Sequence, residues 1–352
     1  MSLHMYGGFL LSQNKKNIFD KLINTLDGMG MGVLATLIVG TILRQIATLL
    51  GDGFSLLFTI GSYAQVMMAV GVAIGVSIGA KVRPTVVYGA IVASVMGAGA
   101  LRLVDGAFTV AVGDPAGAFA ATIVAIIAGT LVAGRTKLDI MLTPLVSIVA
   151  GGLAAIFISP HVTATTALVG QIVTAATDMH PFLMGIIVSV IFCFIILSPL
   201  SSSALAIGLG LSGIAGGAAL AGTAASMVGF ATISFKDNGI EGLVSQGIGT
   251  SKIQFGNFVK RPAILLPTII AAAITGPAST LLFQIETNSL GAGMGTSGLV
   301  GQIQTLYVMG TDALWMIVLA QIVLPIAISL FVYKGLLRLG WIRHGDMVLP
   351  RG

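Results

Sequence analysis

Long apolar segments alternate with short polar ones along almost the whole chain. From Pro181 to Phe235 the sequence runs for 55 residues without one Asp, Glu, Lys, Arg or His. A helix that crosses the hydrocarbon core of a bilayer needs about 20 apolar residues, so this stretch has room for two or more membrane segments. Other charge-poor runs of sufficient length lie at 28–50, 54–80, 84–101, 116–134, 140–159, 263–283 and 313–333. The pattern predicts an all-α, polytopic bundle of about eight to ten transmembrane helices.

Basic residues gather between the apolar runs and towards both ends of the chain. Because cytoplasmic loops carry an excess of Lys and Arg, we expect these clusters and both termini to be cytoplasmic. For the cluster that begins at Lys236 to return to that side, the region 182–235 must cross an odd number of times, although its length suits two helices. One piece of it is therefore predicted to be broken or re-entrant, with breaks at Pro199–Ser203 and in the glycine run Gly208–Gly222.

The stretch Gln284–Thr311 is a second irregular region. Five glycines and several small polar residues lie between Asn288 and Gln302, which makes this stretch too polar for a lipid-facing helix. A re-entrant hairpin and an extracellular loop both fit this composition.

These features divide the chain into an N-terminal segment and one membrane domain. Residues 1–27 contain an amphipathic stretch that suits a helix lying at the membrane interface. Residues 161–178 place their apolar side chains on one helical face, and we expect a second surface-lying helix there. The membrane domain, residues 28–352, is expected to comprise mainly scaffold spans at 28–159, broken helices and re-entrant loops at 160–311, and the last span at 312–340.

Composition supports a multi-pass protein of the plasma membrane, in contact with the lipid bilayer. Hydrophobic residues make up 56% of the 352 residues, charged residues only 8%, and the mean hydropathy is +1.04. Soluble domains carry about 25% charged residues. The net charge of +5 is dispersed instead of gathered in a patch, so nucleic acid is not an expected partner.

No catalytic or metal-binding pattern accompanies the apolar runs. The sequence contains neither a His-Glu-x-x-His motif nor a Walker lysine motif. Its single cysteine, Cys193, lies in an apolar run and is interpreted as a small core residue. Gly75–Gly79 spells the Gly-x-Ser-x-Gly motif of hydrolases, but its place inside an apolar run indicates a close helix contact. We expect no enzymatic activity, no cofactor and no metal.

Polar side chains at membrane depth mark a substrate or ion path by default, because burying them unpaired is costly. Amides and hydroxyls predominate here, which suits a polyhydroxylated or otherwise neutral polar ligand. Gln246, Thr250 and Gln254 share one helical face and suit either a path lining or a polar seam. Glu241 equally suits a solvated loop, and His180 suits an interfacial helix start. The candidate substrate-binding residues are Asn238, Glu241, Gln246, Thr250, Ser251, Gln254, Asn288, Thr296, Ser297, Gln302, Ser201, Ser202 and His180.

The chain resembles the membrane-embedded enzyme IIC subunits of the sugar phosphotransferase system, and most closely the IIC-like branch that includes the PfoR-type regulators. The resemblance extends from the N-terminal helix to the basic C-terminus. It is carried by four strings, at Gly113–Ala121, Thr136–Leu145, Pro199–Ala204 and Asn238–Ser251.

The resemblance implies a homodimer in which each subunit has a scaffold half and a transport half, with substrate held between re-entrant hairpins near the midplane. In fructose-type members, a segment similar to Gly247–Phe255 carries a glutamate that contributes to the sugar site, and Thr250 stands at that place here. A Pro-His-Gly-Gly signature of those members is replaced by the loop Gly291–Gly301. We expect any phosphotransfer to need separate cytoplasmic proteins.

Three functions fit these observations. The leading hypothesis is a IIC-like carrier that moves a sugar or other small polar solute by alternating access, without phosphorylation domains of its own. The alternative is a PfoR-like membrane sensor that retains the IIC fold and signals to a cytoplasmic partner through the basic loop Lys236–Arg261. A passive channel is the third.

Overall fold

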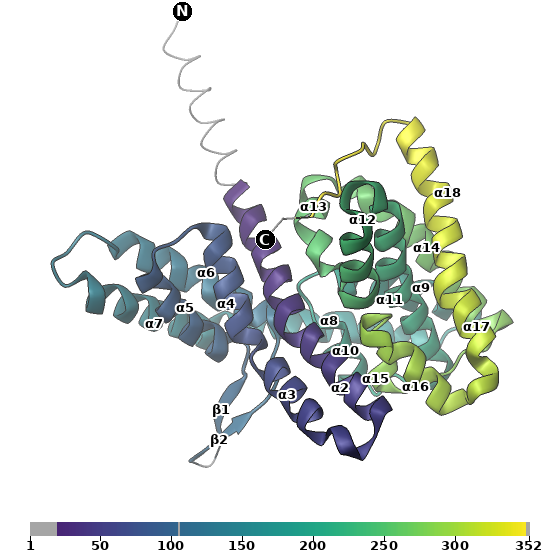
Figure 1. Cartoon of the computed structure of the whole chain (residues 1–352), viewed down its shortest axis with the longest axis horizontal. Coiled ribbons are helices and arrows are strands. Elements are labelled where there is room, and N and C mark those ends of the chain that lie inside the picture. The colour runs from purple at the N-terminus through teal and green to yellow at the C-terminus, as the bar shows by residue number, and fades with distance from the viewer. Residues whose placement is uncertain (1–19, 105, 350–352) are drawn as a thin grey trace, which may run out of the picture.

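The computed structural model describes residues 20–104 and 106–349, which are predominantly helical (Figure 1). In this part of the chain six helices are long and apolar enough to cross a membrane, and the pair Ser55–Val66 and Met68–Ala80, bent by 51°, brings the count to seven. The helices Pro84–Gly97 and Pro181–Leu197 are apolar as well but shorter. The count of six or seven lies below the predicted range of about eight to ten. The all-α, polytopic bundle is confirmed.

The elements follow one another as a chain of helices interrupted by one β-hairpin. The first part consists of η1 (Leu34–Ile38), α2 (Val39–Leu50), η2 (Asp52–Phe54), α3 (Ser55–Val66), α4 (Met68–Ala80), α5 (Pro84–Gly97), β1 (Leu101–Val104), β2 (Ala107–Val110), α6 (Pro115–Val132), α7 (Asp139–Phe157) and α8 (Ser159–Thr177). The second part consists of α9 (Pro181–Leu197), α10 (Ser202–Gly208), α11 (Gly213–Ile233), α12 (Phe235–Val244), η3 (Ser245–Gly249), η4 (Ser251–Gln254), α13 (Phe255–Lys260), η5 (Pro262–Leu265), α14 (Leu266–Pro277), η6 (Ala278–Leu282), α15 (Ser289–Ala292), η7 (Ser297–Leu299), α16 (Val300–Met309), η8 (Thr311–Ala313), α17 (Leu314–Val318), η9 (Leu319–Val323) and α18 (Leu324–Arg338).

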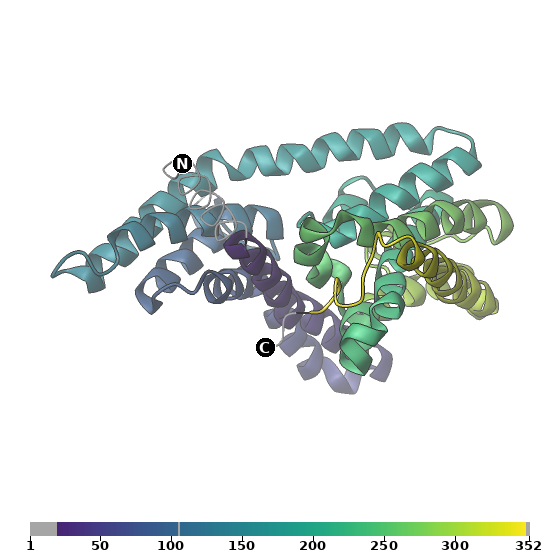
Figure 2. The same ribbon diagram turned by 90° about the horizontal axis from the view of Figure 1, so that it is seen from above.

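The helices form two lobes. In the first lobe α4, α5, α6 and α7 pack around a core of mostly small side chains that includes Val72, Ala90 and Ala125. In the second lobe α9, α14 and α18 surround α11, the most deeply buried of the candidate spans. The helix α8, which covers most of the segment predicted to lie on the surface, runs from the first lobe to the second (Figure 2).

Glycines let helices approach closely in both lobes. A Cβ atom on Gly75 would stand 2.0 Å from the carbonyl oxygen of Gly28, so the Gly-x-Ser-x-Gly string marks a helix contact, as predicted. A Cβ on Gly222 would stand 1.9 Å from the carbonyl oxygen of Ser189, and this contact joins α11 to α9. Larger residues at these positions would push the helices apart.

The break predicted in region 182–235 falls at two points. The chain leaves helical geometry between α9 and α10, within Ser198–Ser201, and again between α10 and α11, within Leu209–Ser212. The Ser201 hydroxyl accepts a hydrogen bond from Ala204 N (3.2 Å) and caps α10. The break at Pro199–Ser203 is confirmed, and the break predicted in the glycine run Gly208–Gly222 lies at the start of that run. Farther along, Gly217 and Gly222 lie within α11, where their missing side chains allow close packing.

The sequence analysis did not predict the β-hairpin, which lies almost entirely in the loop between the apolar runs 84–101 and 116–134. The helix α5 ends at Gly97, and Gly99 adopts a positive φ of 63° that redirects the chain. The strands β1 and β2 then pair in antiparallel register, with Arg102 opposite Thr109, and project from the first lobe (Figure 1).

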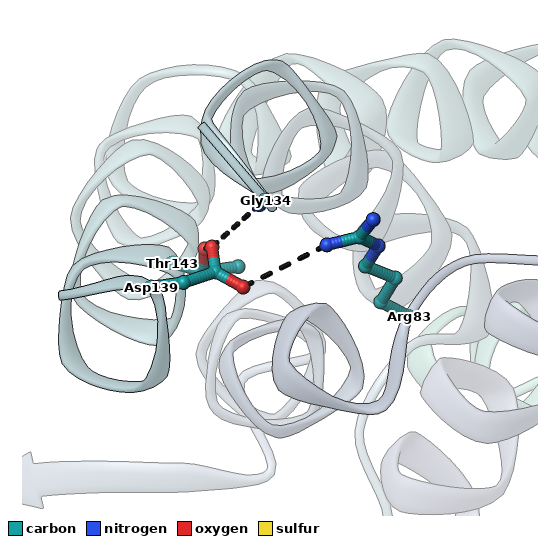
Figure 3. A network of polar contacts seen from close by, with 4 residues as sticks. All are labelled: Arg83, Gly134, Asp139 and Thr143. Carbon is teal, nitrogen blue, oxygen red and sulfur yellow. Dashed lines mark hydrogen bonds and ion pairs between the residues drawn. The ribbon is translucent and has the colours of Figure 1, made fainter. Parts of the chain in front are cut away.

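An acidic residue ties together the ends of three helices in the first lobe (Figure 3). One carboxylate oxygen of Asp139 accepts hydrogen bonds from Gly134 N and from the Thr143 hydroxyl, both at 2.7 Å. The other oxygen lies 3.8 Å from a guanidinium nitrogen of Arg83. The segment Thr136–Leu145, which contains Asp139 and carries part of the family resemblance, thus stabilises the turn between α6 and α7.

The chain is helical from Asp20, the first described residue, to the end of α2, without a break at residue 28. The remainder of the predicted interfacial segment, residues 1–19, lies outside the described residues.

Candidate solute-binding cavity

A cavity of ≈ 700 Å³ lies where several separate parts of the chain meet. One wall comes from α2, α3 and the turn that precedes α6. The opposite wall comes from the two broken regions of the second lobe and from the segment that carries Thr250 and Lys252. Its polar lining residues are Thr41, Arg44, Gln45, Thr48, Gln65, Ser201, Ser202, Ser203, Thr250, Lys252, Ser297, Gln304 and Tyr307. A cavity of this size accommodates a small organic ligand.

The second irregular region is hydrogen-bonded beside this cavity to η3 and to α10. The Thr296 hydroxyl donates to the carbonyl oxygen of Gly247, and the Ser297 hydroxyl donates to that of Gly249 (2.7 Å). The Ser202 hydroxyl donates to Gly293 O (2.7 Å) and joins α10 to the same segment. Because residues 291–297 are largely buried against the second lobe, a re-entrant hairpin fits this region better than an extracellular loop.

Four of the sequence-predicted residues line the cavity: Ser201, Ser202, Thr250 and Ser297. Their hydroxyls also organise its backbone. Ser201 caps α10, and the Thr250 hydroxyl accepts a hydrogen bond from Lys252 N (3.3 Å) at the start of η4. Capping fixes the irregular backbone that forms this wall.

Two other candidates, Asn238 and Gln254, hold the C-terminal segment of the chain, and a third, Gln246, contacts Gln254. The Asn238 side chain donates to Met347 O and accepts from Leu349 N, both at 2.8 Å. The Gln254 amide donates to the same Met347 carbonyl (2.9 Å) and to the Gln246 side-chain oxygen (2.9 Å). These amides form a polar seam, one of the two interpretations that the helical spacing left open.

The remaining candidates also lie outside the cavity lining. Ser251 is buried against the Ser226 hydroxyl (3.0 Å). Asn288 caps α15 by accepting a hydrogen bond from Gly291 N (3.0 Å). The Thr296 hydroxyl donates to Gly247 O. Gln302 donates to Gln321 Oε1 (2.7 Å) inside the bundle. Glu241 is exposed on α12, and His180 is exposed at the start of α9, where its Nδ1 accepts from Phe182 N (3.3 Å).

Sequence reasoning missed the arginine of the cavity. Its position late in the first apolar run predicted that Arg44 extends to the outer interface. Instead, its guanidinium donates to Gln65 Oε1 and lies 4.5 Å from the centre of the Phe58 ring. Gln65 Nε2 in turn donates to the Thr41 hydroxyl (2.7 Å). Contacts between α2 and α3, which a linear pattern does not reveal, hold this side chain at the cavity.

Lys252 also lines the cavity. It belongs to the segment Lys236–Arg261, which was expected to be a cytoplasmic basic loop. That expectation is wrong for Lys252, which is only 6% exposed. Its ammonium group donates to the carbonyl oxygens of Ile195 (3.4 Å), Ser198 and Leu200 (2.5 Å), where α9 ends. Those carbonyls have lost their helical partners, so a buried cation stabilises them.

Asp114, whose charge interacts with that of Lys252, caps α6 through a hydrogen bond from Gly117 N (3.1 Å). Burial raises the pKa of this carboxyl group above its usual value, while the backbone hydrogen bonds and the charge of Lys252 oppose that rise. Among the described residues that line the cavity there is no Asp or Glu.

Broken helices that meet at a cavity are typical of membrane transport proteins. The model of the phosphotransferase system EIIC family matches residues 23–349. This chain therefore belongs to the phosphotransferase system EIIC family. A search of curated proteins finds no match.

Proposed function

We propose that this protein is a carrier that moves a sugar or other small polar solute across the plasma membrane by alternating access. The observation that carries the proposal is the cavity of ≈ 700 Å³ between the two lobes, closed on one side by both broken regions. Sites at repeat or lobe interfaces built from discontinuous helices are typical of carriers, because rocking of one part against the other exposes them to either side.

The proposal includes a homodimer with both termini in the cytoplasm and no catalytic step within this chain. Family membership and the basic clusters support these features. Any phosphorylation of the solute then needs separate cytoplasmic proteins.

A thermal-shift screen of the purified protein against sugars, sugar alcohols and related solutes tests this function. A ligand at roughly a hundred times its dissociation constant stabilises the folded protein by about 2.7 kcal/mol. The bound solute should then enter proteoliposomes that contain the wild-type protein. Ala204→Trp fills the cavity from its wall and should abolish both the shift and the uptake.

One observation favours the sensor as the second candidate function. The C-terminal segment rests on the polar block that precedes α13 through Asn238, Gln254 and Asn257, whose amide donates to Val348 O (2.8 Å). A docked tail on a predicted cytoplasmic face suits a signalling surface. Solute binding without uptake, accompanied by ligand-dependent protease sensitivity of residues 342–349, would favour this candidate over the carrier.

A further inference from the structure

We propose that the solute is an oxyanion, a polyhydroxylated molecule that carries a carboxylate or a phosphate. This inference rests on the proposed function, since it assigns a ligand class to the same cavity. Two cationic side chains, Arg44 and Lys252, line that cavity, and no described lining residue is acidic. Asp114, next to the lining residue Pro115, balances one of the two charges, so one positive charge remains for the ligand.

Arg44 is the group that contacts the anion. A guanidinium has five N–H donors, and the one hydrogen bond found for it goes to the neutral amide of Gln65. The Phe58 ring lies against the guanidinium group and fixes its plane. Its remaining donors match two oxygens of a carboxylate or a phosphate.

Lys252 is not available to contact the anion. Its three N–H donors are all used by the carbonyl oxygens of Ile195, Ser198 and Leu200. Its charge interacts with that of Asp114. The positive charge that remains for the ligand is therefore that of Arg44.

The rest of the lining suits the hydroxyl groups of such a molecule. Ser201, Ser203 and Thr250 present hydroxyls from the second lobe, and Gln45 presents an amide from α2. Gln304 uses its oxygen to accept from Asn288 Nδ2 (2.6 Å), which leaves its own amide N–H groups as donors. The charged group and the hydroxyl groups of one solute would thus contact opposite walls.

Calorimetric titration of the purified protein against three matched series tests the inference. The probes are aldohexoses, the corresponding uronic acids, and the corresponding hexose 6-phosphates. We expect the anionic member of a pair to bind about tenfold or more tightly than the neutral one, the range of a charge-assisted hydrogen bond. Preference for the uronic acid identifies a carboxylate site, and preference for the 6-phosphate identifies a phosphate site.

Two variants locate the anion. Arg44→Gln should remove the preference for the anionic member over the neutral one, while Arg44→Lys should restore part of it. Gln45→Glu adds a negative charge to the same wall, leaves the Arg44–Gln65 contact intact, and should also remove the preference. Arg102→Gln deletes an exposed positive charge on the β-hairpin and is the matched control, with no change expected.

The outcomes separate the two proposals. Neutral hexoses that bind as tightly as their acids and phosphates would overturn the oxyanion inference and leave the carrier standing. Unchanged anion preference in both Arg44→Gln and Gln45→Glu would also overturn it, because the anion would then bind elsewhere. The absence of binding by all three series would overturn the oxyanion inference, and failure of the wider solute screen as well would overturn the proposed function.

Discussion

The side chain of Asn238 pairs with the backbone on both sides of Val348, because its amide donates to Met347 O and its oxygen accepts from Leu349 N, both at 2.8 Å. The Met347 side chain is fully buried. A residue 109 positions earlier in the chain therefore anchors the C-terminal segment in the way a neighbouring strand would. Nearby, Asp346 lies 3.5 Å from the Arg261 guanidinium and adds an ionic contact.

Replacing this asparagine should destabilise the protein without changing what it binds. Asn238→Ala removes both hydrogen bonds and leaves Leu349 N without its partner, while Met347 O keeps its bond from Gln254, and we expect a cost of about 1–3 kcal/mol. We expect a lower thermal midpoint in detergent and faster proteolysis of residues 342–349. Glu241→Ala, on an exposed position of the same helix, is the control. Equal stability of the two variants would show that the tail contact contributes nothing.

The lysine at the end of α9 should be essential for folding. Lys252→Met keeps the length of the side chain but leaves the carbonyl oxygens of Ser198 and Leu200 without their donor. Unpaired buried polar groups cost about 1–3 kcal/mol each, so we expect mostly aggregated protein in fluorescence-detected size exclusion. Lys236→Met, at an exposed position, should elute as the wild type does. A folded, monodisperse Lys252→Met protein would contradict this assignment.

Class and architecture could be predicted from the sequence because the bilayer constrains helix length and composition strongly. Both irregular regions were also found, since glycine, serine and proline at membrane depth are incompatible with a plain lipid-facing helix. The contact at Gly75 followed from the same reasoning about small residues.

The site itself was predicted only in part. Ser201, Thr250 and Ser297 lie in segments with a local signal, and they line the cavity. Arg44 and Lys252 carry no such signal. A charged side chain near the end of an apolar segment is expected to extend to the membrane interface, and only tertiary packing places it in the interior. Polarity alone also does not distinguish a ligand-binding site from a polar contact between segments of the chain. Asn238, for example, pairs with the C-terminal segment instead of lining the cavity.

A buried amide pair joins α16 to η9 and should behave as a coupled unit. Gln302 Nε2 donates to Gln321 Oε1 (2.7 Å), while the other two side-chain atoms have no partner. Gln321→Leu alone leaves the Gln302 amide unpaired and should cost about 1–3 kcal/mol. The double variant Gln302→Leu/Gln321→Leu should be more stable than the sum of the single changes predicts. Strict additivity in thermal or denaturant unfolding would show that the pair is not coupled.

The closest helix contact of the first lobe should not tolerate a side chain. Gly75→Val places its Cβ 2.0 Å from Gly28 O, so the two helices must separate and lose packing. Overpacking of this kind costs about 1–3 kcal/mol, and we expect a clear drop in the thermal midpoint. Gly335→Val on α18 meets no atom within 4 Å and should leave the midpoint unchanged. Similar midpoints for both variants would refute the close contact.

Thiol labelling at the cavity wall tests alternating access most directly. Cys193 is fully buried, so a single introduced cysteine, Ser203→Cys, can be followed against a low background. A membrane-impermeant maleimide is applied to intact cells and, separately, to inside-out vesicles. The account predicts labelling of position 203 from both sides, with protection by a bound solute. Labelling from one side alone under every condition, or from neither side, would contradict a carrier whose solute site lies in this cavity.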